Sequence, residues 1–193
     1  MSPTARDVQA FFEEVATDWD TMRLAYYDES VIEKMATVSG ADRGGGMTVA
    51  DIGTGTGFVA AGLSPRVGRV VAVDNSAAML GVARQNLAAL EATNVDLVEG
   101  DMSHLPLPDD SVDAAFANMV LHHAPEPPAM LREMARVVKP GGTVAITDEV
   151  EHPYKWMREE HADLWLGFSP EAVEEFFGEA GLVSYGYESL GMQ

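Results

Sequence analysis

The spacing of hydrophobic positions along this chain changes near residue 47. Before that point, apolar side chains recur at helical intervals, at Val8, Phe11, Phe12, Val15 and Trp19, and again at Val31, Ile32, Met35 and Val38. This spacing predicts two amphipathic helices within residues 4–40. Glycines at position 40 and at 44–46 then interrupt the pattern. We therefore expect residues 1–46 to form an N-terminal helical cap on a domain that spans 47–193.

From residue 47 onward, short apolar runs alternate with helical patterns. The runs are mostly continuous in apolar residues, as in parallel strands covered on both faces, and lie near 47–52, 69–74, 95–100, 112–118 and 143–148. Helices are expected after Ser76, from Glu126 to a stop at 140–142, and from Ser169 to Gly181. The alternation predicts an α/β fold, a doubly wound, mostly parallel Rossmann-like sheet with N-terminal helices.

A glycine-rich turn and an acid follow the first two predicted strands. Residues 49–57 read VADIGTGTG, and Asp74 closes the run VVAVD, 23 residues after Asp51. Glycines let the backbone approach a ligand closely, and an acid at the end of the next strand can bind two ribose hydroxyls. A dinucleotide fingerprint would require glycine at position 58, where this chain has Phe58. That difference disfavours a nicotinamide-dependent oxidoreductase.

The third and fourth predicted strands are also followed by polar residues. Asp101 and Met102 come after the third, whereas Asn118 closes the fourth and leads into MVLHH at 119–123. A VKPGG step at 138–142 precedes the fifth. In an open α/β sheet, ligands bind at the carboxyl ends of the strands. The cofactor and the substrate are therefore expected at this edge.

These five motifs follow one another between about Val49 and Asp148. Together, and in this order, they resemble the motifs of the class I S-adenosylmethionine-dependent methyltransferases. The branch they resemble includes quinone-biosynthesis and arsenite methyltransferases. The resemblance implies S-adenosylmethionine as cofactor and methyl transfer to a small-molecule acceptor by in-line displacement. A non-catalytic S-adenosylmethionine-binding or regulatory module, or a subunit of a hetero-oligomer, is the alternative.

The resemblance also implies roles for individual residues. Asp51 would lie near the cofactor's ammonium group, Asp74 would bind the ribose, and Asp101 and Met102 would contact the adenine. The full set of cofactor-binding residues implied in this way is Asp51, Gly53, Thr54, Gly55, Gly57, Asp74, Asn75, Met79, Asp101, Met102 and Asn118.

Catalytic residues are harder to identify, because the sulfonium cofactor supplies the driving force and the protein mainly aligns the reactants. His122 and His123 are the candidates, since a neutral imidazole can act as a base near pH 7. A purely structural role for the pair stays open. Residues 148–165 mix carboxylates, imidazoles and aromatics. We expect this segment to form a substrate lid rather than a metal site built from Asp148, Glu149, His152 and His161, and we expect no metal ion.

The amino-acid composition restricts the classes of partner that this chain is expected to bind. Thirty-one acids and 12 basic residues give a net charge of −19, which disfavours binding to nucleic acid and to anionic membranes. The charge is compatible with a neutral or cationic acceptor, although solubility or a salt-adapted source explains it more simply. With no cysteine, the chain lacks the ligands that arsenic-methylating relatives use. The N-terminus has no apolar export signal, so cytoplasm is the expected compartment.

The end of the chain departs from the family pattern. In the family that the chain resembles, the sheet ends with a sixth strand and a seventh, antiparallel one. Residues 182–188 can supply the sixth, but only five residues follow. We therefore expect the seventh strand to be absent. Because an unpaired edge favours covering or pairing, a homodimer is a possible consequence.

Overall fold

Five parallel strands form the centre of the molecule. The computed structural model describes residues 3–41 and 45–191. The sheet has the order β3-β2-β1-β4-β5 and consists of β1 (Thr48–Ile52), β2 (Arg69–Asp74), β3 (Val95–Glu99), β4 (Val112–Asn118) and β5 (Val138–Thr147). This arrangement confirms the predicted α/β, doubly wound fold. Only β5 begins earlier than expected, because the chain enters the strand directly from the preceding helix.

The central strands are largely apolar because both faces of the sheet are covered, whereas the edge strand β3 carries the exposed acids Asp96 and Glu99. Along β1, Val49 packs into the core on one face while Ala50 and Ile52 pack into the core on the other. Strands β2 and β4 alternate in the same way between the two clusters. Successive side chains of a strand point to opposite faces, so a strand covered on both sides needs apolar residues at every position.

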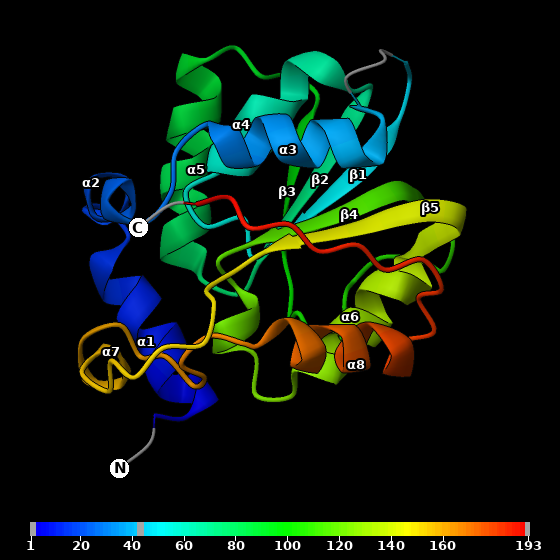
Figure 1. Cartoon of the computed structure of the whole chain (residues 1–193). Helices are drawn as coiled ribbons and strands as arrows, with labels where there is room; N and C mark the ends of the chain where they lie inside the picture. The colour runs from blue at the N-terminus through cyan, green and yellow to red at the C-terminus, as the bar shows by residue number, and fades with distance from the viewer. Residues whose placement is uncertain (1–2, 42–44, 192–193) are drawn as a thin grey trace.

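The helices that cover the two faces match the sequence patterns. Figure 1 shows α3 (Ser30–Ser39) and α4 (Phe58–Leu63) on one face, and α6 (Pro127–Val137) and α8 (Pro170–Glu179) on the other. Helix α5 (Ala77–Ala89) follows β2, and the Ser76 hydroxyl caps it by accepting a 3.1 Å hydrogen bond from Met79 N. Short turns, η3 (Ser64–Arg66) and η4 (Leu121–His123), follow α4 and β4.

The N-terminal segment forms two structurally different parts. Helix α1 (Ala5–Val15) begins with a capping box between Thr4 and Asp7, and α2 (Trp19–Met22) and η1 (Arg23–Ala25) follow it. Figure 1 shows α1 and α2 with α7 (Met157–Glu160) at the end of the sheet where the strands finish, whereas α3 lies on the sheet itself. Both amphipathic helices are confirmed. The division of the chain at residue 46 stays a prediction.

The expected sixth strand is wrong. Residues 182–191 form no strand, and within the described residues nothing pairs with the outer edge of β5. Tyr185 packs on Phe177 of α8, whereas Glu188 forms an ion pair with Lys34 of α3. The segment is therefore held by helices on opposite faces, with Val183 97% exposed, and its Leu190 packs against the core cluster on the α3 face without forming a strand beside β5. The expected homodimer stays a prediction.

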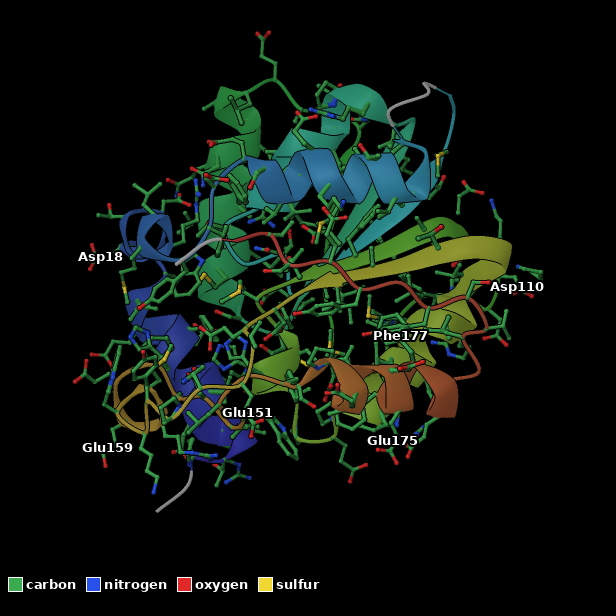
Figure 2. All side chains as sticks on the ribbon, viewed as in Figure 1. Asp18, Asp110, Glu151, Glu159, Glu175 and Phe177 are labelled. Carbon is green, nitrogen blue, oxygen red and sulfur yellow. The ribbon has the colours of Figure 1, made fainter. Side chains whose placement is uncertain are left out.

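The acidic residues are spread over the outside of the molecule. Figure 2 labels Asp18, Asp110, Glu151, Glu159 and Glu175, which project from different elements around the fold. The negative charge is thus distributed rather than gathered at one site. None of the helices in the described part of the chain is both long and apolar enough to cross a membrane.

Candidate functional site: two adjoining cavities at the strand ends

A cavity of about 800 Å³, partly open to solvent, lies where β1, β2 and β4 end. Nine of the eleven predicted cofactor residues line it: Asp51, Gly53, Thr54, Gly55, Asp74, Asn75, Met79, Met102 and Asn118. The carboxyl-end position expected for the ligand is therefore the position of this cavity.

The glycine loop approaches the cavity in a conformation that side chains disfavour. Gly53, Gly55 and Gly57 all have positive φ, of 68°, 54° and 85°. A Cβ at Gly53 would lie 2.6 Å from the Val120 side chain, whereas one at Gly55 would meet only the Trp19 ring at 3.7 Å. Gly53 thus serves close packing behind the loop, and Gly55 keeps the backbone accessible from the cavity.

Asp51 is held on one side by the loop it precedes. Its Oδ2 accepts hydrogen bonds from Thr54 Oγ1 at 2.6 Å and from Ala60 N at 3.1 Å. The residue is 1% exposed, and burial raises the pKa of its carboxyl from 3.8 to about 7, with a further contribution from the negative charge of Asp74. Both hydrogen bonds use one oxygen, so the carboxylate can accept a cationic group at the cavity.

Asp74 at the end of β2 is positioned by backbone groups. Its Oδ2 accepts from Gly55 N at 2.8 Å and its Oδ1 accepts from Ser76 N at 2.9 Å. Burial raises the pKa of this carboxyl, and the backbone hydrogen bonds oppose that shift. The acid therefore links the glycine loop to the start of α5 and presents a carboxylate to the cavity.

Two of the predicted cofactor-binding residues do not line the first cavity. Gly57 is the N-cap of α4, where a Cβ would lie 3.3 Å from Ala83 of α5, so its site is a helix–helix contact. Asp101 is exposed and its Oδ1 accepts from Ser103 N at 2.7 Å in a local turn. Its neighbour Met102 does line the cavity.

A second cavity of about 340 Å³ adjoins the first. The two share four lining residues, Trp19, Tyr27, Met119 and His123. The other residues around the second cavity are Phe11, Tyr26, His122, Glu149, Met157, His161 and Asp163. We call this second cavity the acceptor chamber. Its walls come from the N-terminal helices, from η4 and from the segment after β5.

The two predicted histidines differ in charge. Burial lowers the pKa of His122, but the charge of Asp148, a 2.8 Å hydrogen bond to it, and the charges of Asp163 and Glu149 outweigh burial and raise that pKa to about 9. Burial and the neighbouring His122 instead hold the pKa of His123 well below its usual value. Near neutral pH, His122 therefore carries a proton and His123 is uncharged.

Residues 148–168 cover the acceptor chamber and are tied to η4. Leu164 N and Trp165 N both donate to the His122 carbonyl, at 3.1 and 3.0 Å, and Trp165 Nε1 donates to the Ala124 carbonyl at 2.9 Å. Four residues of the predicted lid segment line the acceptor chamber, namely Glu149, Met157, His161 and Asp163. The opening and closing of the segment stays a prediction.

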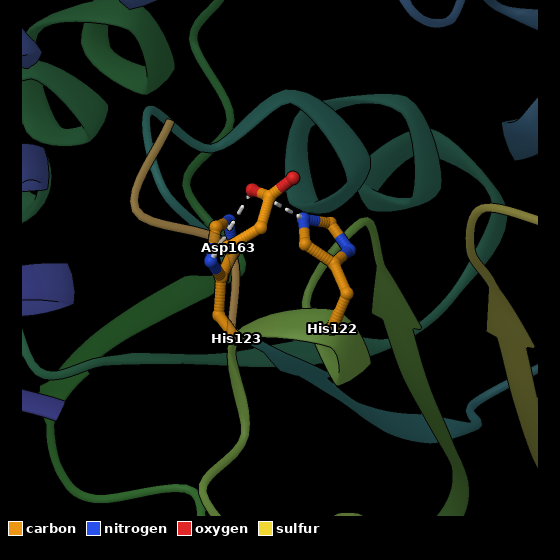
Figure 3. Close-up of side chains that lie close together, drawn as sticks. All are labelled: His122, His123 and Asp163. Carbon is orange, nitrogen blue, oxygen red and sulfur yellow. Dashed lines mark ion pairs between the residues drawn. The ribbon is translucent and has the colours of Figure 1, made fainter. Parts of the chain in front are cut away.

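Several lining residues are not among the predicted site residues. Phe12, Trp19 and Tyr27 line the first cavity. For Trp19 and Tyr27, the sequence favours packing of the N-terminal helices, with a place over the acceptor pocket as the alternative. Asp163 belongs to no sequence motif, and only the tertiary fold brings it close to His122 and His123 of η4. The four residues Asp148, Glu149, His152 and His161 do not converge as a metal-binding group within the described chain. Figure 3 shows the set that does, which consists of His122, His123 and Asp163.

Comparison with known proteins identifies a family that the chain matches. Residues 50–146 match the model of a family described as "Methyltransferase domain". A demethylmenaquinone methyltransferase of Clavibacter sepedonicus is 32% identical over 98% of this chain and 77% of its own length. An arsenite methyltransferase of Halobacterium salinarum is 40% identical over 55% of this chain, which spans only 28% of that protein.

A solved structure extends the comparison to three dimensions. A SAM-dependent methyltransferase from Aquifex aeolicus superimposes with a TM-score of 0.64 and 29% identity, covering 80% of this chain and 88% of the other. The similarity therefore extends over most of the described fold.

Proposed function

This chain belongs to the methyltransferase-domain family, within the S-adenosylmethionine-dependent methyltransferases, and on that premise we propose that it methylates a small molecule held in the acceptor chamber. The observation that carries the proposal is the pair of adjoining cavities. One holds the glycine loop with Asp51 and Asp74, and the other opens beside it at Met119 and His123.

In the first cavity, the cofactor would contact groups along the strand ends. Asp51 would pair with its ammonium group, the 53–57 loop would lie along its methionine part, and Asp74 would accept hydrogen bonds from both ribose hydroxyls. Met79, Met102, Asn75 and Asn118 would complete the surroundings of the nucleoside. Asp101 would reach the adenine only if its local turn rearranged, because its carboxylate is bonded to Ser103 N.

In the acceptor chamber, aromatic walls favour a small, flat acceptor. Phe11, Trp19, Tyr26 and Tyr27 supply ring surfaces, and relatives of this chain act on demethylmenaquinone and on phytyl-naphthoquinone substrates. His123 meets both cavities and is uncharged near pH 7, so it can accept a proton from an acceptor hydroxyl. His122 already carries a proton and would orient its neighbours instead.

The transfer itself needs alignment more than side-chain chemistry. The acceptor atom attacks the methyl carbon as the carbon–sulfur bond breaks, and the sulfur leaves with the bonding electrons as a neutral thioether. The protein lowers the barrier by holding acceptor, methyl group and sulfur in line and by excluding water. The N-terminal aromatic residues and the 148–168 segment are the elements that would exclude water.

The experiment is isothermal titration of the purified chain with S-adenosylmethionine and with S-adenosylhomocysteine, followed by a panel of hydroquinone, phenol and amine acceptors. We expect both cofactor forms to bind, one per chain, and methylated product from at least one acceptor class. Absence of binding would contradict the proposal. Binding without turnover on every acceptor would limit the chain to a cofactor-binding module.

A further inference from the structure

Three polar atoms of two side chains in the acceptor chamber are buried without hydrogen-bond partners in the described part of the chain. Asp163 is 1% exposed, and neither of its carboxylate oxygens has a hydrogen-bond partner within the described residues. The Nδ1 atom of His123 is also buried and unpartnered in that part of the chain. A buried carboxylate without hydrogen bonds is costly, because folding removes its hydration and supplies nothing in return. Such a group indicates a missing ligand.

The unpartnered atoms converge. His122 Nε2 lies 3.7 Å from Asp163 Oδ1, and His123 Nδ1 lies 4.0 Å from the same oxygen (Figure 3). One ligand atom from each of the three residues fits within a span of 4.8 Å. Zinc–nitrogen and zinc–oxygen bonds of about 2.0–2.2 Å place neighbouring tetrahedral ligands about 3.3 Å apart. To share one ion, the two pairs with Asp163 Oδ1 would need to close by about 0.4–0.7 Å, and the two histidine nitrogens by up to about 1.5 Å.

A second carboxylate orients the first histidine. Asp148 Oδ1 lies 2.8 Å from His122 Nδ1, and its Oδ2 accepts a 2.8 Å hydrogen bond from Leu121 N. The arrangement leaves His122 Nε2 directed at Asp163. A carboxylate that binds the remote nitrogen of an imidazole fixes its orientation and raises its basicity, as it does for histidines that bind metals.

The backbone on both sides of the cluster is strained. Met119 precedes η4 with φ of 56°, and Ala162 precedes Asp163 with φ of 59°. Left-handed conformations at residues other than glycine are disfavoured and tend to gather at functional sites. The N–H group of Met119 donates a 2.8 Å hydrogen bond to the Thr147 carbonyl, which holds Met119 in this strained conformation. The fold thus accepts strain at both segments that bring the three side chains together.

We propose that His122 Nε2, His123 Nδ1 and Asp163 form a binding site for a divalent transition-metal ion with the ligand preferences of zinc. Two imidazoles and one carboxylate suit Zn²⁺, Co²⁺ or Fe²⁺ better than Mg²⁺ or Ca²⁺, which prefer oxygen ligands only. All three residues line the acceptor chamber, so the remaining coordination positions face the space where an acceptor would bind.

The role of the ion follows from that position and rests on the proposed function. An acceptor hydroxyl or thiol bound to the ion would release its proton to water and present an anionic atom to the methyl group. The carbon–sulfur electrons would still leave with the sulfur, so the ion changes the acceptor and not the cofactor. With the ion bound, His123 acts as a ligand and no longer as a base.

The first test is titration of the metal-free chain with Co²⁺ and Zn²⁺ in the presence of excess Mg²⁺, which occupies the many surface acids. We expect one Co²⁺ per chain, with the strong visible absorption of a four- or five-coordinate site, displaced by Zn²⁺. Only the weak spectrum of hydrated Co²⁺, or a signal removed by Mg²⁺, would overturn the proposal.

Variants locate the site. Asp163→Asn and His123→Gln should each weaken Co²⁺ binding about tenfold or more, and Asp148→Asn by about 10–100-fold, because it orients a ligand without touching the ion. His104→Gln changes an exposed histidine outside the cluster and should bind Co²⁺ as the unaltered chain does. Unchanged affinity in Asp163→Asn would refute the site.

The same preparations separate this proposal from the proposed function. Each variant is also titrated with S-adenosylhomocysteine, which contacts the first cavity and reports that the fold is intact. Failure of the unaltered chain to bind S-adenosylhomocysteine would count against the cofactor proposal alone. Failure to bind Co²⁺ by a chain that binds S-adenosylhomocysteine would count against the metal site alone.

Discussion

The two cavities differ in how their acids are satisfied. In the first, Asp51 and Asp74 accept hydrogen bonds from backbone N–H groups and from Thr54, all within 25 residues of one another. In the acceptor chamber, Asp163 lies more than 40 residues after His122 in the sequence, and its buried carboxylate accepts no hydrogen bond within the described chain. The first site is prepared by its own loop, whereas the second depends on distant segments and on whatever binds there.

This difference explains which part of the site is general and which is specific. A loop that satisfies its acids locally can hold the same cofactor in many proteins, because the hydrogen bonds to Asp51 and Asp74 come from the glycine loop and from the starts of α4 and α5. The acceptor chamber is assembled from α1, α2, η4 and residues 148–168, so changes in any of these segments would alter the acceptor. The following predictions test the contrast, in order of decreasing effect.

The largest expected effect is the pH dependence of Asp51. Its pKa in the folded protein is about 7 against an unfolded value of 3.8, so its protonated form stabilises the fold. That stability is complete below pH 4 and is lost as pH rises to about 7. The linked difference approaches about 4 kcal/mol, from about 1.4 kcal/mol per pKa unit.

Asp51→Asn isolates this contribution. Between pH 4 and pH 8, the unaltered chain should lose stability relative to the variant in urea unfolding. Cofactor affinity should change in the opposite direction, because the ammonium group prefers the carboxylate, and should fall as pH drops below about 7. Parallel stability curves for the two proteins would show that Asp51 titrates normally.

Asp74→Ala should weaken S-adenosylhomocysteine binding by about 1–3 kcal/mol, the scale of hydrogen bonds to a charged group. Calorimetry measures this change. Asp96→Ala is the matched control, since it removes an exposed acid that pairs with Arg69 on the neighbouring strand. Equal affinities in the two variants would remove Asp74 from the cofactor site.

Asp163→Asn should stabilise the metal-free chain at neutral pH, in the same direction as Asp51→Asn. Burial raises the pKa of Asp163 to about 6, and the attraction of His122 does not offset it, so the charged form is unfavourable at pH 7. The neutral variant of the metal-free chain should therefore be more stable by about 1–2 kcal/mol. The gain should disappear near pH 4, where the native carboxyl is itself protonated. A loss of stability at pH 7 would indicate that the ion pairs with the histidines are favourable.

The smallest effect is expected where the covering segment is joined to η4. Trp165→Phe removes one hydrogen bond, from Nε1 to the Ala124 carbonyl, and should cost about 0.5–1.5 kcal/mol. Cofactor affinity should not change, because Trp165 does not line the first cavity. Thermal unfolding measures the loss of stability, and calorimetry on the same sample measures cofactor affinity. A loss of affinity in the variant would show that the defect extends to the cofactor site.

The sequence by itself determined the sheet and the cofactor loop. Continuous apolar runs predict covered strands, and residues 49–57 with Asp74 predict a ligand loop, because both depend on interactions that are short in sequence. Nine predicted residues line the cavity for this reason. Asp101 and Gly57 did not, since a local turn and a helix contact use them first. The sixth strand was wrong because residues 182–191 contact α3 and α8 and form no ladder with β5.

Tertiary structure alone decided the acceptor chamber. No spacing rule relates Tyr26, His123 and Asp163, and no local hydrogen bond predicts that a carboxylate from the covering segment will lie beside η4. Amphipathic spacing indicated that the aromatic residues of α1 and α2 face inward, but not that they face a cavity. The physical reason is that burial and charge pairing between distant segments depend on how the chain closes over the sheet, and a sequence pattern records only what each segment does on its own.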